Sequence, residues 1–176
     1  MGDKGERWFD ALFEAHYPDV LRYVLRRAPL ASAEDVLAET FLVAWRRPEQ
    51  VPDDPLPWLL GIARRVLANQ RRGELRRHAL LARLRVASAE EVDAWQPPSS
   101  VSRELGGALA SLPDREREAL LLLAWEGLDI SRAAVAAGCS TATFRVRLHR
   151  ARKRVAQRLA HPTPDSSLTR PSEKTL

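Results

Sequence analysis

The stretch from residue 130 to 154 constrains the fold of this chain more than any other. It reads ISRAAVAAGCSTATFRVRLHRARKR. Ser131 can cap a short first helix, Gly138 can end that helix with a positive φ, and Ser140 can cap a second helix. Two helices around a glycine turn, the second rich in arginine, are typical of a helix-turn-helix motif that places its second helix in the DNA major groove. The alternative is an αα-hairpin whose basic face is only solvated.

Positive charge is concentrated in two separate blocks, although the net charge of the chain is only +5. Residues 62–85 hold eight arginines against the single acid Glu74, and residues 130–164 hold eight basic groups and no acid. Residues 1–61 are acidic on balance, with eleven acids against seven Lys and Arg. Two basic blocks in such a background predict two contacts with a polyanion, although arginine on a helix surface can also serve solubility alone.

The composition argues against most catalytic and membrane functions. Cys139 is the only cysteine, so no disulfide framework or Cys-x-x-Cys metal site is expected. There is no glycine-rich phosphate loop and no clustered constellation of His, Cys and carboxylates, so we expect neither an enzyme nor a bound metal or cofactor. The N-terminus does not resemble a signal peptide, and the longest apolar run, 119–125, is too short to span a bilayer. A reduced, cytoplasmic protein without membrane contact is the simplest expectation.

The first half of the chain has the pattern of amphipathic helices. Apolar residues recurring at three- and four-residue steps predict a helix over 8–27, with a break or kink at Pro18. A second helix is expected to start near Ser32, capped by its hydroxyl. The four prolines of 48–57 predict a stiff, irregular loop, and 58–85 is expected to form a long helix or a pair of helices.

A change in pattern at 86–101 predicts a flexible linker, because this segment is acidic, contains two prolines and has no sustained period. Helices are then expected over 102–112 and 113–126, followed by the helix-turn-helix. The tail from 161 to 176 is expected to be disordered. The sequence therefore predicts an all-α protein with two small helical domains, 8–85 and 102–160, of which the second is a helix-turn-helix domain.

Taken in order, these segments resemble the extracytoplasmic-function (ECF) group of sigma-70 family sigma factors, over about residues 8–160. AEDVLAETFLVAW is similar to the family's helix that binds core RNA polymerase, and PWLLGIARRVLANQRR to its promoter −10 helix. LPDREREALLL and RLHRARKRV are similar to parts of its −35 domain. The resemblance implies a non-enzymatic protein that gives core RNA polymerase its promoter recognition. Its partners would be core RNA polymerase and promoter DNA, and in many relatives also an anti-sigma factor.

The resemblance implies that the −35 element is read as duplex by the second helix of the motif. Arginine can bind guanine O6 and N7 as a bidentate pair in the major groove, while other contacts reach phosphates and position the protein. Val146 could contact a thymine methyl group or simply pack. The candidate −35 residues are Ser140, Thr141, Thr143, Arg145, Val146, Arg147, His149, Arg150 and Lys153.

The resemblance also implies that the −10 element is read after melting, with a flipped base held by the loop at 49–57. Asp54 could accept hydrogen bonds from exocyclic amines, but a solvated turn is the favoured interpretation. Trp58 could stack on a base, but its flanking residues favour a core position. The candidate −10 residues are Asp54, Trp58, Arg64, Arg65, Asn69, Arg71 and Arg72.

Polymerase binding is expected on the acidic second helix. Asp35 and Glu39 could pair with basic groups of the polymerase, and Leu42 and Trp45 would supply apolar area. An amphipathic core helix explains Trp45 as well, but it explains Leu42 less well because Leu42 lies off the main apolar stripe. The rival hypothesis for the whole chain is an ordinary dimeric helix-turn-helix regulator, with residues 1–85 as its dimerisation or sensing domain.

Overall fold

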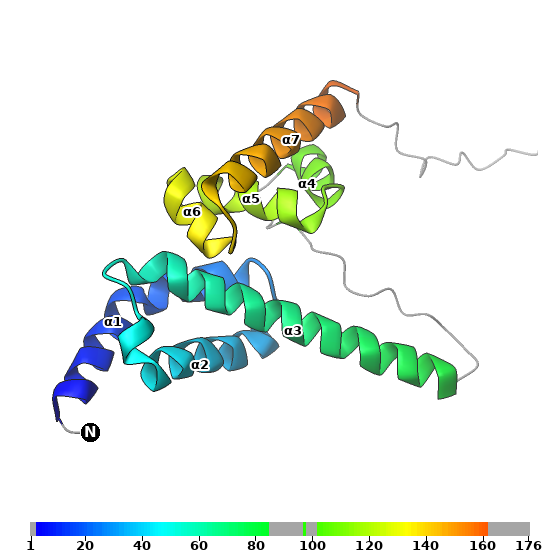
Figure 1. Cartoon of the computed structure of the whole chain (residues 1–176). Coiled ribbons are helices and arrows are strands. Elements are labelled where there is room, and N and C mark those ends of the chain that lie inside the picture. Colours follow the sequence, from blue (N-terminus) through cyan, green and yellow to red (C-terminus); the bar gives the residue numbers. More distant parts are fainter. Residues whose placement is uncertain (1–2, 85–96, 98–101, 162–176) are drawn as a thin grey trace, which may run out of the picture.

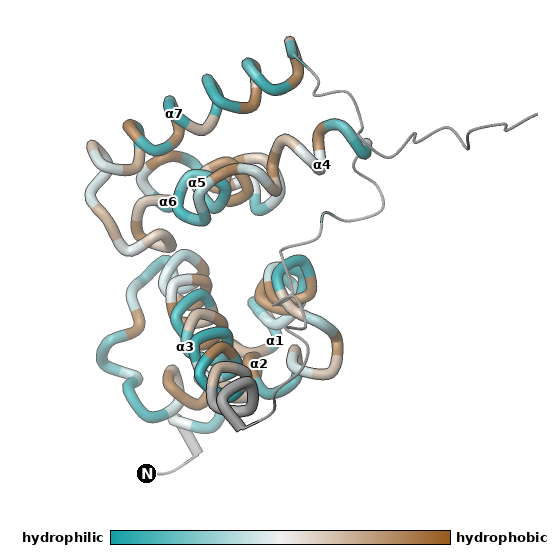
Figure 2. Tube along the Cα trace, turned by 90° about the vertical axis from the view of Figure 1, so that its right-hand side faces the viewer, coloured by the Kyte–Doolittle hydropathy of each residue, from teal (hydrophilic) through white to brown (hydrophobic). Residues whose placement is uncertain are grey.

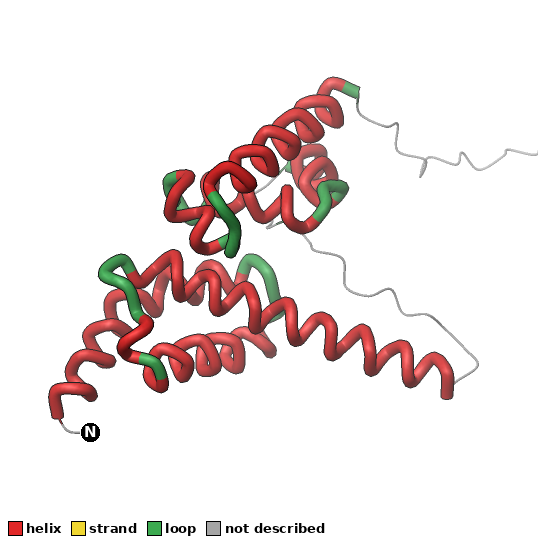
Figure 3. The backbone as a smooth tube through the Cα atoms, in the orientation of Figure 1, coloured by secondary structure: helices red, strands yellow, loops and turns green. Residues whose placement is uncertain are grey.

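The chain is all helical wherever its structure is described. The computed structural model describes residues 3–84, Pro97 and residues 102–161, and every regular element in these ranges is a helix (Figure 3). The prediction of an all-α protein with two helical domains is confirmed. The expected linker, apart from Pro97, and the tail beyond His161 lie outside the described residues. The helices are α1 (Asp3–Leu25), α2 (Leu30–Arg46), α3 (Pro55–Leu84), α4 (Arg103–Ala110), α5 (Asp114–Ala124), α6 (Ile130–Ala136) and α7 (Thr141–Ala160).

The described helices form two layers (Figure 1). In the first layer, α1, α2 and α3 pack against one another around buried residues such as Val24, Val36 and Leu60. In the second layer, α4, α5 and α6 pack against α7. Hydrophobic and hydrophilic residues alternate along α3 and α7 (Figure 2), as expected of helices that bury one face. The two layers touch, since α3 packs directly against α6.

The first layer differs from the expectations in two details: α1 is not broken at Pro18, and Ser32 does not cap α2. α1 begins at Asp3 and runs through Pro18 as one helix, because Pro18 is exposed and buried residues such as Leu12 and Val20 hold the helix on both sides of it. α2 begins at Leu30, with Pro29 at the cap position, so Ser32 is not its cap. The Ser32 hydroxyl instead donates a hydrogen bond to the Pro29 carbonyl.

The proline-rich loop is shorter than expected. Residues Pro48–Gln50 form a 3₁₀ turn, and α3 already begins at Pro55, so Pro57 lies inside its first turn. Proline is tolerated there because the first N–H groups of a helix have no partner within it. The remaining loop is Val51 to Asp54, and the following segment is one helix rather than a pair.

The helix-turn-helix has the expected turn and second cap, but a different first cap. Gly138 has φ of 61° and Ser140 accepts a hydrogen bond from the Thr143 amide, both as predicted. The predicted first cap, Ser131, is wrong. The carboxylate of Asp129 accepts hydrogen bonds from the amides of Ser131 and Arg132 at 2.8 and 2.9 Å, so Asp129 caps α6.

Candidate nucleic-acid interface

The buried side of α7 determines which of its residues face outward. Phe144, Leu148 and Ala151 are buried at steps of four and three residues, so they form the face that packs against the other helices of the layer. The opposite face is available to a partner. Of the −35 candidates, Thr141 and Arg147 are half-buried, while the others are exposed: Ser140, Thr143, Arg145, Val146, His149, Arg150 and Lys153.

Two of the −35 candidates, Ser140 and Thr143, already have a structural task. The Ser140 hydroxyl caps α7 and donates a hydrogen bond of 2.9 Å to the Thr143 hydroxyl. Val146 is 50% exposed, so it is not a core residue. The exposed ridge from Thr143 to Lys153 is therefore the part of α7 that can enter a groove.

The −10 candidates on α3 fall into two groups. Arg65, Asn69, Arg71 and Arg72 are exposed, and the last two already donate hydrogen bonds: Arg72 to the Asn69 amide oxygen, and Arg71 to the Arg27 carbonyl at 2.8 Å. Arg64 is half-buried, because its Nε donates to the Ala136 carbonyl of the other layer at 3.1 Å.

The other two −10 candidates lie near the start of α3. Trp58 is half-buried and packs against the hydrophobic core. Asp54 is exposed and forms a bidentate ion pair with Arg132 of α6, with N–O distances of 2.7 and 2.9 Å. Arg64 and Asp54 therefore both make contacts between the layers, which the sequence reasoning did not anticipate.

The polymerase candidates on α2 lie beside a cluster of aromatic rings. Asp35, Glu39 and Leu42 are exposed, and Trp45 is half-buried with its ring edge-on to Phe9 at 5.1 Å. The sequence reasoning missed the contribution of α1 to this surface. Phe13 of α1 is 37% exposed and lies 4.8 Å from the ring of Phe41.

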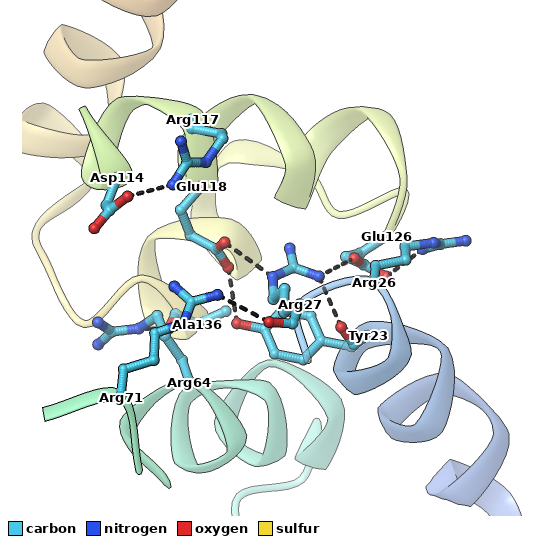
Figure 4. Close-up of polar contacts among 10 residues, drawn as sticks. All are labelled: Tyr23, Arg26, Arg27, Arg64, Arg71, Asp114, Arg117, Glu118, Glu126 and Ala136. Carbon is cyan, nitrogen blue, oxygen red and sulfur yellow. Dashed lines mark hydrogen bonds and ion pairs between the residues drawn. The ribbon is translucent and has the colours of Figure 1, made fainter. Parts of the chain in front are cut away.

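The sequence reasoning also missed a buried polar cluster between α1 and α5 (Figure 4). The Arg27 side chain is 5% exposed, and its guanidinium donates to Glu118 at 3.0 Å and to Glu126 at 2.9 Å. The Tyr23 hydroxyl donates to the other oxygen of Glu118 at 2.8 Å, and the Arg27 guanidinium lies over the Tyr23 ring at 3.6 Å. Arg26 extends the cluster with its own ion pair to Glu126. These five residues are called the seam cluster below.

Burial shifts the protonation equilibria of the seam cluster. Burial, together with the nearby carboxylate of Glu118, raises the pKa of Tyr23 well above its usual value of 10.0. Burial alone would lower the pKa of Arg27, but Tyr23, Glu118 and Glu126 outweigh it and raise that pKa. Both groups therefore keep their protons, which is the state that the observed hydrogen bonds require.

The two layers also meet where the backbone of α3 approaches that of α6. A Cβ atom added at Gly61 of α3 would lie 3.5 Å from the carbonyl oxygen of Ala136 in α6. A Cβ atom added at Gly138 would lie 2.9 Å from the guanidinium of Arg64. Glycine at these positions allows α3 and the turn of the second layer to touch, and the carbonyl that Arg64 binds lies in this contact.

No helix in the described ranges is both long and apolar enough to cross a membrane. Within the same residues, no group of three or more His, Cys, Asp or Glu side chains is arranged to hold a metal ion.

Comparison with known proteins identifies the family. The chain matches the family models for Sigma-70 region 2 over residues 12–77 and for Sigma-70, region 4 over residues 102–155. It is 30% identical over 144 residues to the ECF RNA polymerase sigma factor SigL of Mycobacterium tuberculosis, covering 79% of this chain and 81% of SigL. It is 32% identical over 164 residues to a probable RNA polymerase sigma-C factor of Mycobacterium bovis, covering 90% and 85% of the two chains.

Solved structures share the fold. The sigma factor RpoE of Bartonella quintana, in complex with the anti-sigma factor NepR, superposes with a TM-score of 0.64 at 23% identity, covering 88% of this chain and 98% of RpoE. CnrH in complex with the cytosolic domain of CnrY superposes with a TM-score of 0.59 at 23% identity, covering 90% and 91%. This chain belongs to the ECF RNA polymerase sigma factors, and its function is in promoter-specific transcription initiation.

Proposed function

We propose that this sigma factor reads the −35 element as duplex with α7. The observation that carries the proposal is the exposed ridge of α7, opposite a buried face that fixes its orientation. Val146, His149 and Arg150 lie on this ridge and would meet base edges, while Lys153 would meet phosphate. Ser140 and Thr143 would add contacts at the start of the helix, beside their capping role.

The melted −10 element would bind along α3 and the loop before it. Arg65, Asn69, Arg71 and Arg72 are exposed on one helix and could follow a single-stranded backbone. Arg64 and Asp54 would join them once their contacts with α6 are released. Because Trp58 packs against the core, we assign it to support of the loop rather than to stacking on a base.

Core RNA polymerase would bind the exposed face of α2 through Asp35, Glu39, Leu42 and the edge of Trp45. The two domains, proposed as 8–85 and 102–160 around a linker at 86–101, would contact DNA and polymerase together. Each contact could then be weak alone, because the tether raises the effective concentration of the second domain. The protein would act in the cytoplasm without catalytic activity of its own, and an anti-sigma factor is a further proposed partner.

Run-off transcription tests the proposal. The full chain is combined with core RNA polymerase on genomic fragments, and the transcript starts are mapped. We expect promoter-dependent transcripts whose upstream sequences share −35 and −10 elements. Arg150→Ala should reduce transcription and relax preference at one −35 position, at a cost of about 1–3 kcal/mol, whereas Arg103→Ala on the exposed surface of α4 should not.

The rival regulator hypothesis predicts different results from the same reagents. An ordinary helix-turn-helix regulator would form a stable dimer and bind its duplex without polymerase. Dimer formation by light scattering, with no transcript and no co-purification with polymerase, would therefore contradict the assigned −35, −10 and polymerase surfaces.

A further inference from the structure

A cleft between the two layers is lined by arginine side chains from both. Its volume is about 370 Å³, and it lies between α3 on one side and α5 and α7 on the other. This volume is within the range of roughly 300–1,000 Å³ typical of small-molecule sites, which often lie between domains. Its arginines are Arg27, Arg64, Arg71, Arg72, Arg115, Arg117 and Arg147.

The carboxylates of the cleft do not neutralise this charge. The cleft contains two acids, and each already has an arginine of the cleft as its partner. Asp114 pairs with Arg117, and Glu118 pairs with Arg27. Figure 4 shows both pairs, with Arg64 and Arg71 approaching from α3. Five arginines of the cleft form no ion pair with any described residue: Arg64, Arg71, Arg72, Arg115 and Arg147.

Packing of the two layers brings like charges together at this cleft. Burial is the main reason that the pKa of Arg117 is lowered, and the charge of Arg71 on the opposite wall lowers it further. Leu67, Leu75 and Leu121 line the same cleft, and apolar walls strengthen charge interactions by excluding water. The packed arrangement therefore leaves more positive than negative charge in the cleft, with seven arginines against two acids.

We propose that the cleft is a binding site for a small, multiply phosphorylated anion, which bridges α3 to α5 and α7 and stabilises the packed arrangement of the two layers. Arginine is suited to this task because its planar guanidinium binds two phosphate oxygens at once. A cleft of about 370 Å³ is of the size of a small-molecule site and is far too small to enclose a DNA duplex. The anion would bind Arg115 together with Arg64, Arg71, Arg72 and Arg147, and so would withhold the last four, which are candidates for contact with promoter DNA.

Calorimetric titration of the full chain with inorganic tripolyphosphate tests the site directly. We expect saturable binding of one tripolyphosphate per chain, and at least about tenfold weaker binding for Arg115→Gln. Arg115 is exposed at the start of α5 and has no assigned role in promoter or polymerase binding. Arg103→Gln removes the same charge from an exposed position on α4 outside the cleft, and should leave the affinity unchanged. Equal weakening by the two variants would overturn the site, because it would show attraction to a basic protein in general.

Energy transfer between the domains tests the coupling. Dyes are attached at Glu14→Cys of α1 and Gln157→Cys of α7, both exposed positions, in a Cys139→Ser background. Tripolyphosphate should increase the population with high transfer, whereas sodium chloride at matched ionic strength should not. Separation of the domains on addition of tripolyphosphate would overturn the proposal.

A single-stranded DNA oligonucleotide distinguishes the two sources of phosphate. If the cleft takes a small anion, the oligonucleotide should lower the energy transfer and its affinity should not depend on Arg115. If the oligonucleotide alone binds, and binds more weakly to Arg115→Gln, the cleft is part of the DNA surface and the proposal fails. Inhibition of run-off transcription by tripolyphosphate would depend on the proposed function of these arginines in promoter binding, whereas binding measured by calorimetry would not. Failure of the proposed function and failure of the proposed binding site can therefore be told apart.

Discussion

The hydroxyl of Tyr23 in α1 donates a hydrogen bond of 2.8 Å to the carboxylate of Glu118 in α5, 95 residues further along the chain. Tyr23 is fully buried, and the same carboxylate accepts a hydrogen bond from Arg27. One acid of the region 4 domain therefore holds two groups of the region 2 domain. Glu118 therefore adds to the other contacts between the two domains, such as the ion pairs Arg26–Glu126 and Asp54–Arg132.

Replacing Glu118 should weaken the contact between the two domains. In Glu118→Gln, the buried guanidinium of Arg27 keeps only Glu126 as an acidic partner, and the lost charge should cost about 2 kcal/mol. Urea unfolding and interdomain energy transfer measure the effect. Glu14→Gln on the exposed face of α1 is the control and should stay within about 0.5 kcal/mol of the native chain. Equal stability and equal transfer in the two variants would show that Glu118 does not hold the domains together.

Side-chain size at Gly61 should control the approach of α3 to α6. Gly61→Ala fits, because its Cβ atom would be in ordinary contact with the Ala136 carbonyl, and removal of a helix-interior glycine should stabilise by about 0.5–1 kcal/mol. Gly61→Leu should force the domains apart and increase the radius of gyration in small-angle scattering.

The matched control for Gly61→Leu is Gly73→Leu on the same helix. A Cβ atom at Gly73 would meet nothing within 4 Å, so the radius of gyration should not change. An unchanged radius for Gly61→Leu as well would show that the packed arrangement tolerates a large side chain at this contact.

Capping of α6 should depend on Asp129 rather than on Ser131. Asp129→Ala removes the acceptor of two backbone amides and should lower the free energy of unfolding by about 1 kcal/mol. Ser131→Ala should have little effect, because only the amide of Ser131 takes part in the cap. Thermal unfolding of the two variants decides the question, and a larger loss for Ser131→Ala would reverse the assignment.

High pH should destabilise the chain through Tyr23. Its pKa in the folded protein is raised above the usual 10.0, so the unfolded chain loses this proton first as the pH rises. The contribution of Tyr23 is fully present below pH 10.0 and is lost above it, at up to about 1.4 kcal/mol per pH unit until the raised pKa is reached. Urea unfolding across this range measures the slope. Tyr23→Phe should reduce it, and an unchanged slope would mean that another group is responsible.

Several features could be predicted because they depend on residues only a few positions apart. The steps between Phe144, Leu148 and Ala151 determine which face of α7 is buried, and so which arginines point outward. Gly138 and Ser140 form the expected turn and cap for the same reason. Where local signals were ambiguous, the structure decided: Asp129 and Ser131 are both good caps, and only the backbone path shows which one accepts the hydrogen bonds.

The sequence by itself determined the helices, their buried faces, the basic surfaces and the family resemblance, because periodicity, capping and charge are local properties. Only the tertiary structure decided that Arg27 is buried between two glutamates and that Arg64 binds the Ala136 carbonyl. Nothing in the neighbouring sequence distinguishes these arginines from exposed ones. Their partners lie 72 to 99 residues away, so their burial follows from how the two domains pack and not from the pattern of the helices that carry them.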